Sequence, residues 1–555
     1  MSAGFGGDRQ SNHGAGAIEV ERLRGVGEGL LKLALIAAVI HFAVMRSWTG
    51  YAGLPNDYHH FSYHPDEIFL LLPSFGFAMG DWNPHFFNYG TLYIYLVGIP
   101  AVFTNLVAEW SSFPTNLRPL YVLGRHITLA MGVGGVALLY WALRREERAV
   151  RQVGTLLLAL CPLYVVHSGY ATVDVPATFW LVLAYGFALA GGQGSDWKMG
   201  VLAGVATGLG AATKYNVGLF AIPVILAPYL APDGIRSKRW IIATIGGVLI
   251  GFVIGCPFVG RPEFVQGVLF ELRHMRLGGT AAFVETGPGW VYHVLHGLPV
   301  GLGLPLLAAV TIGLPVAAAR PNRATRLAAV WVVLYLLVIG FGKERFIRYL
   351  IPLMPFVCVI AASGMVWLVR RIKRSLARAM AVGLGAAVIG LTACYTQGQM
   401  RSLVQPDARD VAWQWARESY ESQGRKWHVG LVQAPWYLHP PASPYNAGPL
   451  SRRWFERWNE KRGKRVIVTG WDVEMVRRQR PDVFFINEAE YYDRIRIGDK
   501  EAEGFVSELH KVYARTRVFE KEPARCSWLA PGRHWAPPDW LYDSPRIIAY
   551  YGPVR

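Results

Sequence analysis

Residues Tyr349–Val369 read YLIPLMPFVCVIAASGMVWLV, and a basic run, Arg370-Arg371-Ile372-Lys373-Arg374, follows directly. The quoted stretch has no charged side chain, and its length is what a helix needs to cross the roughly 30 Å hydrocarbon core of a bilayer. A surface helix of a soluble protein would carry a polar face instead. The stretch therefore predicts a membrane-spanning helix that ends at a cluster of cations.

The same pattern recurs along most of the chain. Of the 555 residues, 52% are hydrophobic and 17% are charged, whereas an ordinary soluble protein has about 25% charged residues. We therefore predict a mainly α-helical, polytopic membrane protein whose spans lie within residues 27–398, after a disordered cytoplasmic tail over residues 1–26. The eleven predicted spans are 27–46, 121–143, 152–169, 175–192, 199–213, 216–231, 240–258, 291–318, 327–341, 349–369 and 380–398.

The basic residues predict how the chain is oriented. Cytoplasmic loops of membrane proteins carry an excess of Lys and Arg, and these spans place four basic clusters on the same side as the N-terminus. That side is predicted to be the cytoplasm. Membrane orientation thus explains the formal charge of +18 better than nucleic-acid binding does. The clusters are Arg144, Arg145, Arg148 and Arg151; Arg236, Lys238 and Arg239; Arg320, Arg323 and Arg326; and Arg370, Arg371, Lys373, Arg374 and Arg378.

One apolar segment is left out of this count. Thr91–Glu109 is apolar enough to look like a span, but it contains Pro100. If it crossed the bilayer, every later basic cluster would change sides, against the positive-inside rule. We therefore predict an interfacial or re-entrant helix within a first external loop over residues 47–120.

The composition changes at about residue 399. Apolar runs become short, charged residues become dense, and strand-like stretches alternate with helix-like ones, which predicts a small α/β domain over residues 399–555. An odd number of spans places this domain outside the cytoplasm. Its single cysteine, Cys526, cannot form a disulfide within the domain. The predicted strands are His428–Gln433, Arg465–Thr469 and Asp482–Asn487, and the predicted helices are Asp410–Glu421, Asp472–Gln479 and Glu501–Val512.

A carboxylate pair follows the first predicted span, in the sequence His64-Pro65-Asp66-Glu67. A carboxylate at the external membrane surface is partly desolvated, which suits a general base that deprotonates an acceptor hydroxyl. We therefore predict Asp66 and Glu67 as catalytic residues. Pro65 restricts His64 to extended geometry, so His64 is predicted to lie beside them. The alternative is a solvated pair that caps a helix starting at Ile68.

Ionisable residues from other parts of the chain are predicted at the external ends of helices. Charges near hydrocarbon cost about 2.5–3.5 kcal/mol and usually line a polar cavity, where Lys and Arg can bind phosphate. The alternatives are an N-cap at Asp174, a snorkelling Lys214, and an Arg network that braces loops through Glu344. The predicted binding residues are Asp174, Lys214, Arg345 and Arg348, with His274, Asn88 and Tyr89 as further candidates.

Motifs of other enzyme classes do not occur in the sequence. There is no Walker loop, dinucleotide fingerprint, zinc-ligand spacing or nucleophile elbow. An external site without nucleotide motifs favours a lipid-phosphate donor. No cofactor is indicated, and a divalent metal is left open.

The order of the motifs resembles that of GT-C glycosyltransferases over about residues 27–400. The most similar branch contains the protein O-mannosyltransferases and the lipid A aminoarabinose transferases. The resemblance lies in His64-Pro65-Asp66-Glu67, Asp81-Trp82-Asn83-Pro84 and Asn88-Tyr89-Gly90-Thr91-Leu92, and continues through Arg125, Asp174-Val175-Pro176, Gly208–Tyr215 and Arg348–Pro352.

The resemblance implies a reaction and roles for several residues. Such an enzyme is an inverting transferase that takes a sugar from a polyprenyl-phosphate carrier outside the cytoplasmic membrane. The family's loop Asp acts as the base and corresponds to Asp66. The acidic residue of the second external turn corresponds to Asp174, the loop His to His274, and the phosphate contacts to Lys214, Arg345 and Arg348.

The predicted function is an integral-membrane inverting glycosyltransferase of the cell inner membrane, with its active site and C-terminal domain extracytoplasmic. Its predicted partners are a polyprenyl-phosphate sugar donor, membrane lipids and an acceptor hydroxyl. Phe87-Asn88-Tyr89-Gly90 replaces the family's Pro-Pro-Leu-Gly-Lys or Lys-Pro motif, so lipid, glycan and protein acceptors all remain open. The alternative function is a transporter or flippase of a lipid-linked sugar, although no internal repeat typical of transporters is visible.

Overall fold

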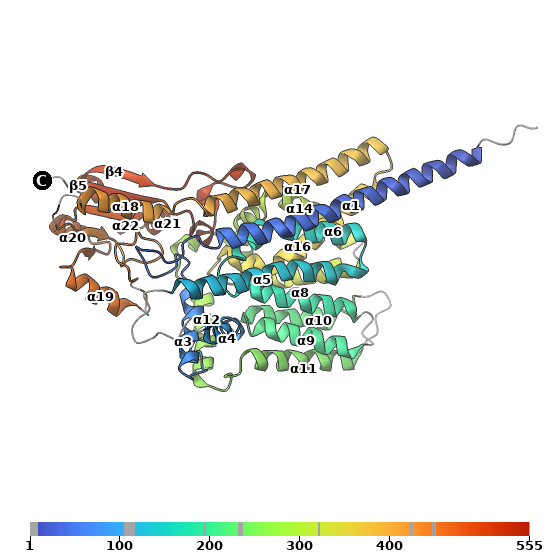
Figure 1. Cartoon of the computed structure of the whole chain (residues 1–555), viewed down its shortest axis with the longest axis horizontal. Helices are drawn as coiled ribbons and strands as arrows, with labels where there is room; N and C mark the ends of the chain where they lie inside the picture. Colours follow the sequence, from blue (N-terminus) through green and yellow to red (C-terminus); the bar gives the residue numbers. More distant parts are fainter. Residues whose placement is uncertain are drawn as a thin grey trace, which may run out of the picture.

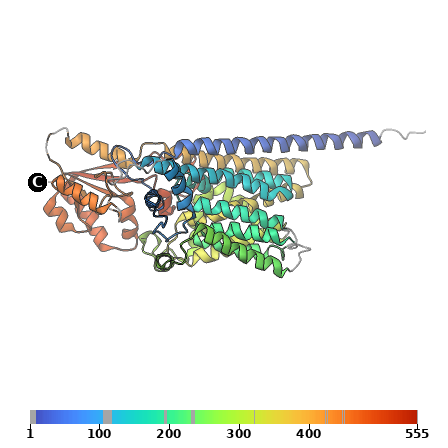
Figure 2. The same ribbon diagram turned by 60° about the horizontal axis from the view of Figure 1, so that its bottom comes forward.

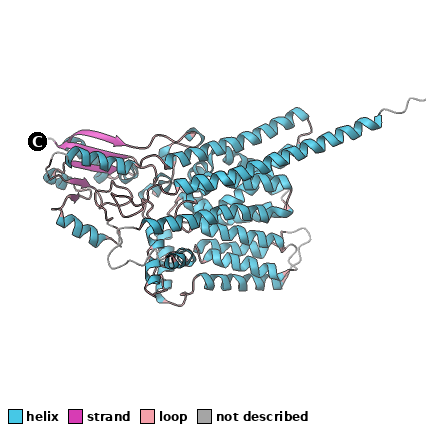
Figure 3. Ribbon diagram, viewed as in Figure 1, coloured by secondary structure: helices cyan, strands magenta, loops and turns pink. Residues whose placement is uncertain are grey.

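Long helices laid side by side form one part of the molecule, and a five-stranded sheet with its own helices forms the other (Figures 1 and 3). The computed structural model describes residues 9–553, except 105–116, 192–195, 231–236, 320–321, 422–423, 425, 447 and 449–450, with side chains from residue 27 onward. This mainly α fold with a small C-terminal sheet is the one predicted from the sequence.

The bundle helices run nearly parallel in two views (Figures 1 and 2). Among the described residues, seven helices are long and apolar enough to cross a membrane. Other predicted spans are shorter or broken, since Pro162 begins a new helix within 152–169, and the count of eleven stays a prediction. The bundle helices are α1 (Arg9–Thr49), α5 (Arg118–Ala142), α6 (Arg148–Ala159), α7 (Pro162–His167), α8 (Asp174–Ala190), α9 (Trp197–Ala211), α10 (Ala221–Leu226), α11 (Lys238–Gly255), α14 (Leu298–Ala319), α15 (Arg323–Gly340), α16 (Met354–Arg371) and α17 (Ser375–Leu403).

The N-terminal region differs from the prediction. Helix α1 begins at Arg9 and extends beyond the other helices (Figure 2). Residues 9–26 are therefore helical rather than a disordered tail, whereas residues 1–8 of the predicted tail lie outside the described residues.

The apolar stretch at 349–369 supplies the most enclosed span of the bundle. It comprises the end of a 3-10 helix, Ile347–Leu353, and most of α16, in which every residue from Met354 to Gly364 is buried. By contrast, α17 exposes the large apolar side chains of Leu376 and Met380. Both helices are apolar because lipid and protein interior are equally free of water.

Three of the four basic clusters meet at one end of the bundle. Arg145 and Arg323 donate hydrogen bonds to the carbonyls of Ala190 (3.1 Å) and Leu189 (3.0 Å), at the end of α8. Arg370 forms an ion pair with Glu147 next to the Arg148 cluster. The sheet domain lies at the opposite end (Figure 1). Two predicted members of these clusters, Arg236 and Arg320, lie outside the described residues.

A layer of short helices lies across the end of the bundle nearest the sheet domain. Helix α4 (Leu92–Phe103) is seen end-on in Figure 1, where the bundle helices run along the page. Its 12 residues span roughly 18 Å, which is too short to cross a bilayer and agrees with the predicted interfacial helix. Residues 105–109 of that segment lie outside the described residues. The other helices of this layer are α2 (Glu67–Leu71), α3 (Pro73–Ala78) and α12 (Pro262–Leu277), whereas α13 (Gly289–Tyr292) is continuous with the helix that contains α14.

The C-terminal part is a mixed sheet covered by helices on both faces. The strand order is β2-β1-β3-β5-β4, with β1 parallel to β2 and β3, and β5 antiparallel to β3 and β4. Alternate residues of β3 point to opposite faces, so Phe485 packs under α18 and Phe484 under α22. Three strands and three helices match the predicted ones, while β4, β5, α19 and α21 are additional. The elements are α18 (Ala408–Tyr420), β1 (Val429–Leu431), α19 (Arg452–Lys461), β2 (Val466–Val468), α20 (Val473–Gln479), β3 (Val483–Asn487), α21 (Glu488–Arg496), α22 (Lys500–Val512), β4 (Tyr513–Phe519) and β5 (Ile547–Pro553).

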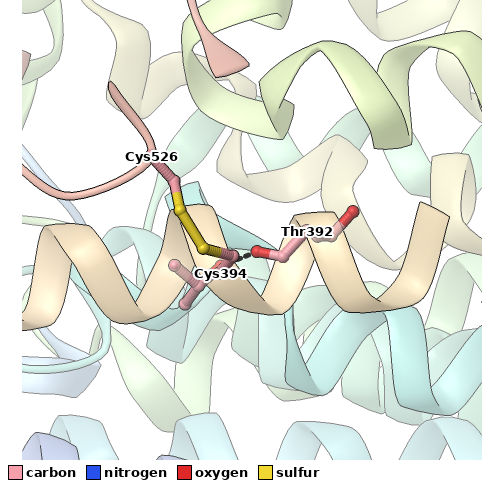
Figure 4. Close-up of a disulfide and its surroundings, with 4 residues drawn as sticks. Thr392, Cys394 and Cys526 are labelled. Carbon is pink, nitrogen blue, oxygen red and sulfur yellow. Dashed lines mark hydrogen bonds between the residues drawn. A yellow bond between two sulfur atoms is a disulfide. The ribbon is translucent and has the colours of Figure 1, made fainter. Parts of the chain in front are cut away.

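Covalent and polar contacts hold the sheet domain against the bundle. A disulfide joins Cys394 of α17 to Cys526, 132 residues later (Figure 4). The hydroxyl of Tyr63 and the amide of Asn56, both in the segment between α1 and α2, donate to Asp410 of α18 at 2.5 and 2.9 Å. The end of the bundle that carries the predicted site residues is therefore covered by the C-terminal domain.

Candidate active site

Asp66 lies at the N-cap position of α2, at the end of the bundle near the sheet domain. Its side chain makes no capping hydrogen bond, and its Oδ2 instead lies 3.1 Å from Nη2 of Arg348. The Asp66 side chain keeps 22% of its surface exposed, whereas Arg348 keeps 8%. The capping alternative is thus not realised for Asp66, and an accessible carboxylate lies against a buried cation.

Arg348 is held by groups on several sides. Its guanidinium carbon lies 4.2 Å from the ring centre of Phe346. Nη1 lies 3.7 Å from Asp539 of the C-terminal domain, too far for a hydrogen bond, and it is buried without a hydrogen-bond partner among the described residues. Asp539 accepts the backbone N–H groups of Ile347 (2.9 Å) and Arg348 (3.1 Å). Burial raises the pKa of Asp539 to about 6, and the charge of Arg348 opposes that rise.

A second buried ion pair lies close to the first. Lys214 Nζ is 2.5 Å from Asp174 Oδ1, and both side chains are buried. Lys214 also lies 4.8 Å from the ring centre of Tyr349, and the Arg348 guanidinium lies 5.8 Å from the same ring. The two predicted phosphate-binding cations therefore flank one aromatic ring. A snorkelling role for Lys214 is excluded by its burial, and the N-cap of α8 is Val173 rather than Asp174.

The turn that carries Lys214 is fixed by the loop of Asn88 and Tyr89. The hydroxyl of Tyr215 donates to the carbonyls of Phe87 and Tyr89, on either side of Asn88, at 2.9 Å each. A Cβ at Gly90 would lie 2.0 Å from the carbonyl oxygen of Ala212, so only glycine allows this close approach. Partial burial raises the pKa of Tyr89, the charge of Asp66 adds to the rise, and the charge of Arg348 opposes it. Asn88 and Tyr89 thus belong to the loop that holds the Lys214 turn, and their role in binding stays a prediction.

Glu67 has a different role from its neighbour. It is fully buried, and its two oxygens accept hydrogen bonds from Nε and Nη2 of Arg125 at 2.7 Å each. It also accepts hydrogen bonds from the hydroxyl of Ser62 and from the backbone N–H of Ala171. This arrangement makes Glu67 a clamp between α5 and the segment that follows α1, instead of the catalytic residue predicted from the sequence. His64 is likewise buried, with Nδ1 3.4 Å from the Asp66 N–H, and burial lowers its pKa.

Two other predicted site residues lie apart from the ion pairs. Arg345 donates to the hydroxyl of Thr286, and the structure gives it no described contact with the Asp66 or Asp174 pairs. His274 lies on the exposed side of α12, stacked on Phe270. Glu344 accepts hydrogen bonds from the N–H and the hydroxyl of Thr280, so it braces that loop through a threonine and not through the predicted arginine network.

The structure adds Asp539 and Glu271 to the cluster. Burial raises the pKa of Glu271, and the charges of Lys214, His274 and Arg348 oppose that rise. Neither residue was predicted, although Glu271 lies three residues before His274. Among the described residues, no group of three His, Cys, Asp or Glu side chains is arranged to hold a metal ion.

Comparisons with known proteins show which proteins this chain resembles. Residues 122–260 match the model of the dolichyl-phosphate-mannose-protein mannosyltransferase family. Undecaprenyl phosphate-alpha-4-amino-4-deoxy-L-arabinose arabinosyl transferase 1 of Sodalis glossinidius (strain morsitans) is 25% identical over 312 residues, which cover 52% of each chain. The match thus spans about half the length of this curated relative.

Solved structures give weaker similarities. AglB, the archaeal oligosaccharyltransferase from Archaeoglobus fulgidus, in complex with an inhibitory peptide and a dolichol-phosphate, has a TM-score of 0.49 at 13% identity over 90% of this chain and 75% of its own. ArnT from Cupriavidus metallidurans, bound to undecaprenyl phosphate, has a TM-score of 0.47 at 13% identity, over 94% of this chain and 98% of its own. The family match and the sequence relative confirm the resemblance of this chain to GT-C glycosyltransferases that use polyprenyl-phosphate sugars.

Proposed function

We propose that the chain is an inverting, multi-pass glycosyltransferase of the cell inner membrane that moves a sugar from a polyprenyl-phosphate carrier to an acceptor hydroxyl on the extracytoplasmic face. The observation that carries this proposal is the accessible Asp66 carboxylate in contact with Arg348, whose buried Nη1 has no hydrogen-bond partner among the described residues. A buried N–H without a partner costs free energy, and an oxygen of the carrier phosphate would satisfy it. Both named sequence matches concern polyprenyl-phosphate sugars.

The arrangement accounts for each bond change in the transfer. Asp66 takes the proton of the acceptor hydroxyl while that oxygen attacks the anomeric carbon of the sugar. The bond from this carbon to the phosphate oxygen breaks, and its electron pair leaves on the polyprenyl phosphate. Arg348 and Lys214 stabilise the negative charge that develops there. Attack from the face opposite the phosphate inverts the configuration of the anomeric carbon.

The disulfide supports the proposed orientation. Disulfides persist outside the cytoplasm, where thiols are not kept reduced, so the Cys394–Cys526 bond favours an external C-terminal domain. The basic clusters at the other end of the bundle favour the same orientation through the positive-inside rule.

Cysteine labelling tests this topology. The three free cysteines are buried and the other two are bonded to each other, so an introduced surface cysteine supplies the accessible thiol. In intact spheroplasts, Ser507→Cys on the exposed side of α22 should react with an impermeant maleimide. Ser375→Cys, beside the Arg370 cluster, should react only after permeabilisation. Labelling of Ser375→Cys alone in intact spheroplasts would reverse the orientation and exclude an external active site.

Binding of undecaprenyl phosphate to the full chain tests the phosphate site. Lys214→Ala and Arg348→Ala should each weaken binding about tenfold or more, because a charge-assisted hydrogen bond contributes roughly 1.5–3 kcal/mol. Arg345→Ala should cost much less, since that side chain binds Thr286. Lys343→Ala, which removes an exposed cation from the same loop, is the matched control, and thermal unfolding reports whether each variant is folded. Unchanged binding by folded Lys214→Ala and Arg348→Ala proteins would leave these cations with a structural role only.

A further inference from the structure

A cavity of about 470 Å³ lies between the sheet domain and the bundle loops near Tyr292. Its volume falls within the range of about 300–1,000 Å³ that is common for ligand pockets. None of the site residues predicted from the sequence is among the described residues that line it. The cavity is therefore a neighbour of the ion-pair cluster and not the cluster itself.

The cavity shares a wall with the Asp66–Arg348 pair. Phe346 and Tyr542 both line it, and the ring centre of Phe346 lies 4.2 Å from the Arg348 guanidinium. The ring of Tyr542 lies 5.8 Å from that of His64, two residues before Asp66. The cavity is thus separated from the Asp66–Arg348 pair by the side chains of Phe346 and Tyr542.

Two aromatic stacks line the cavity. Tyr292, His296 and Trp535 form the first, with ring centres 4.6 and 4.2 Å apart, and Tyr492 and His534 form the second, at 4.3 Å. Trp535 is packed on His296 yet remains 45% exposed, so part of the indole is free for contact. A sugar ring presents a patch of C–H groups, and the partly positive hydrogens of these groups are attracted to the negative face of an aromatic ring.

The arginines of the cavity wall are all paired, and Glu285, which also lines the cavity, is exposed to solvent. An anionic or cationic ligand would have to compete with ion pairs that already exist, at a cost in desolvation. Hydroxyl groups can accept from and donate to the same paired side chains without a net charge of their own. Each lining arginine is paired: Arg533 with Glu488 at 2.8 Å, Arg496 with Asp493 at 2.9 Å, and Arg409 with Asp407 at 2.7 Å.

We propose that this cavity binds the acceptor and that the acceptor is a neutral oligosaccharide. Free aromatic surface, paired charges and the shared wall with Asp66 together favour a glycan over a protein or a charged lipid headgroup. The assignment of the bound glycan as acceptor rests on the proposed function, whereas glycan binding itself does not.

Calorimetry with the detergent-solubilised full chain tests the cavity directly. Neutral trisaccharides of mannose, glucose, galactose and arabinose serve as probes, and at least one should bind in the absence of donor. Trp535→Ala and Tyr492→Ala should weaken that binding roughly fivefold or more, as expected for loss of one aromatic stacking surface. Trp528→Ala is the matched control, because Trp528 is 70% exposed and lies on the neighbouring loop outside this cavity.

The outcomes separate the cavity from the catalytic proposal. The inference is overturned if none of the trisaccharides binds, if Trp528→Ala weakens binding as much as Trp535→Ala, or if a sulfated trisaccharide or an acidic peptide binds more tightly than every neutral probe. Binding that responds to Trp535→Ala, in a protein that transfers no sugar, would support the cavity and reject the transferase. Sugar transfer with an acceptor KM that Trp535→Ala leaves unchanged would support the transferase and reject the cavity as the acceptor site.

Discussion

Replacing Asp66 by Asn is expected to abolish sugar transfer while undecaprenyl phosphate binding stays nearly intact. The substitution keeps the size of the side chain and its ability to accept a hydrogen bond from Arg348, but removes its basicity. A positioned general base typically contributes about 10²–10⁴-fold to the rate. The measurement uses the reconstituted full chain and compares the rate of transfer from a polyprenyl-phosphate sugar with the affinity for the carrier. The rate should fall while the affinity stays.

Asp81→Asn is the matched control for this experiment. Asp81 lies in the same external loop, is more than half exposed, and pairs with His85 at 2.8 Å, so its replacement should leave the rate unchanged. The contrast also separates the two predicted functions, because a flippase needs no base and would move lipid-linked sugar normally with Asn at position 66. A near wild-type rate of transfer in the Asp66→Asn protein would reject the proposed mechanism.

Glu67→Gln is expected to act on stability. The substitution leaves the buried guanidinium of Arg125 without its ionic partner, and breaking a buried pair from one side typically costs about 3–5 kcal/mol. The thermal unfolding temperature and the yield of folded protein should both fall. The molecules that do fold should still transfer sugar, since Asp66 and Arg348 are unchanged.

A double variant provides the control for the buried pair. Removing both charges, as in Glu67→Gln with Arg125→Met, should recover much of the lost stability, because no uncompensated charge remains. The exposed Asp81–His85 pair should contribute little to stability because solvent screens it, so Asp81→Asn should unfold like the wild type. A stable Glu67→Gln protein with no transfer activity would instead return Glu67 to the catalytic role predicted from the sequence.

The sequence alone determined the features that depend on local composition. A charge-free run such as 349–369 can only be stable away from water, and cations at its end favour one side of a membrane. The helices and parallel strands of the C-terminal domain were predicted for the same reason, since their periodicity lies within a few residues. Strand β4 was missed because five of its seven residues are exposed, and an edge strand of this kind lacks alternation.

Only the tertiary structure decided which ionisable groups belong to the site. Asp66 and Glu67 are adjacent, but consecutive residues at a helix start point in different directions. One therefore reaches Arg348 and stays accessible, while the other is enclosed with Arg125, 58 residues away. Arg345 and Arg348 also have different partners, since Arg345 contacts Thr286 and Arg348 contacts Asp66. Hydropathy and charge are properties of a segment, whereas the partner of a buried charge depends on which distant segments pack around it.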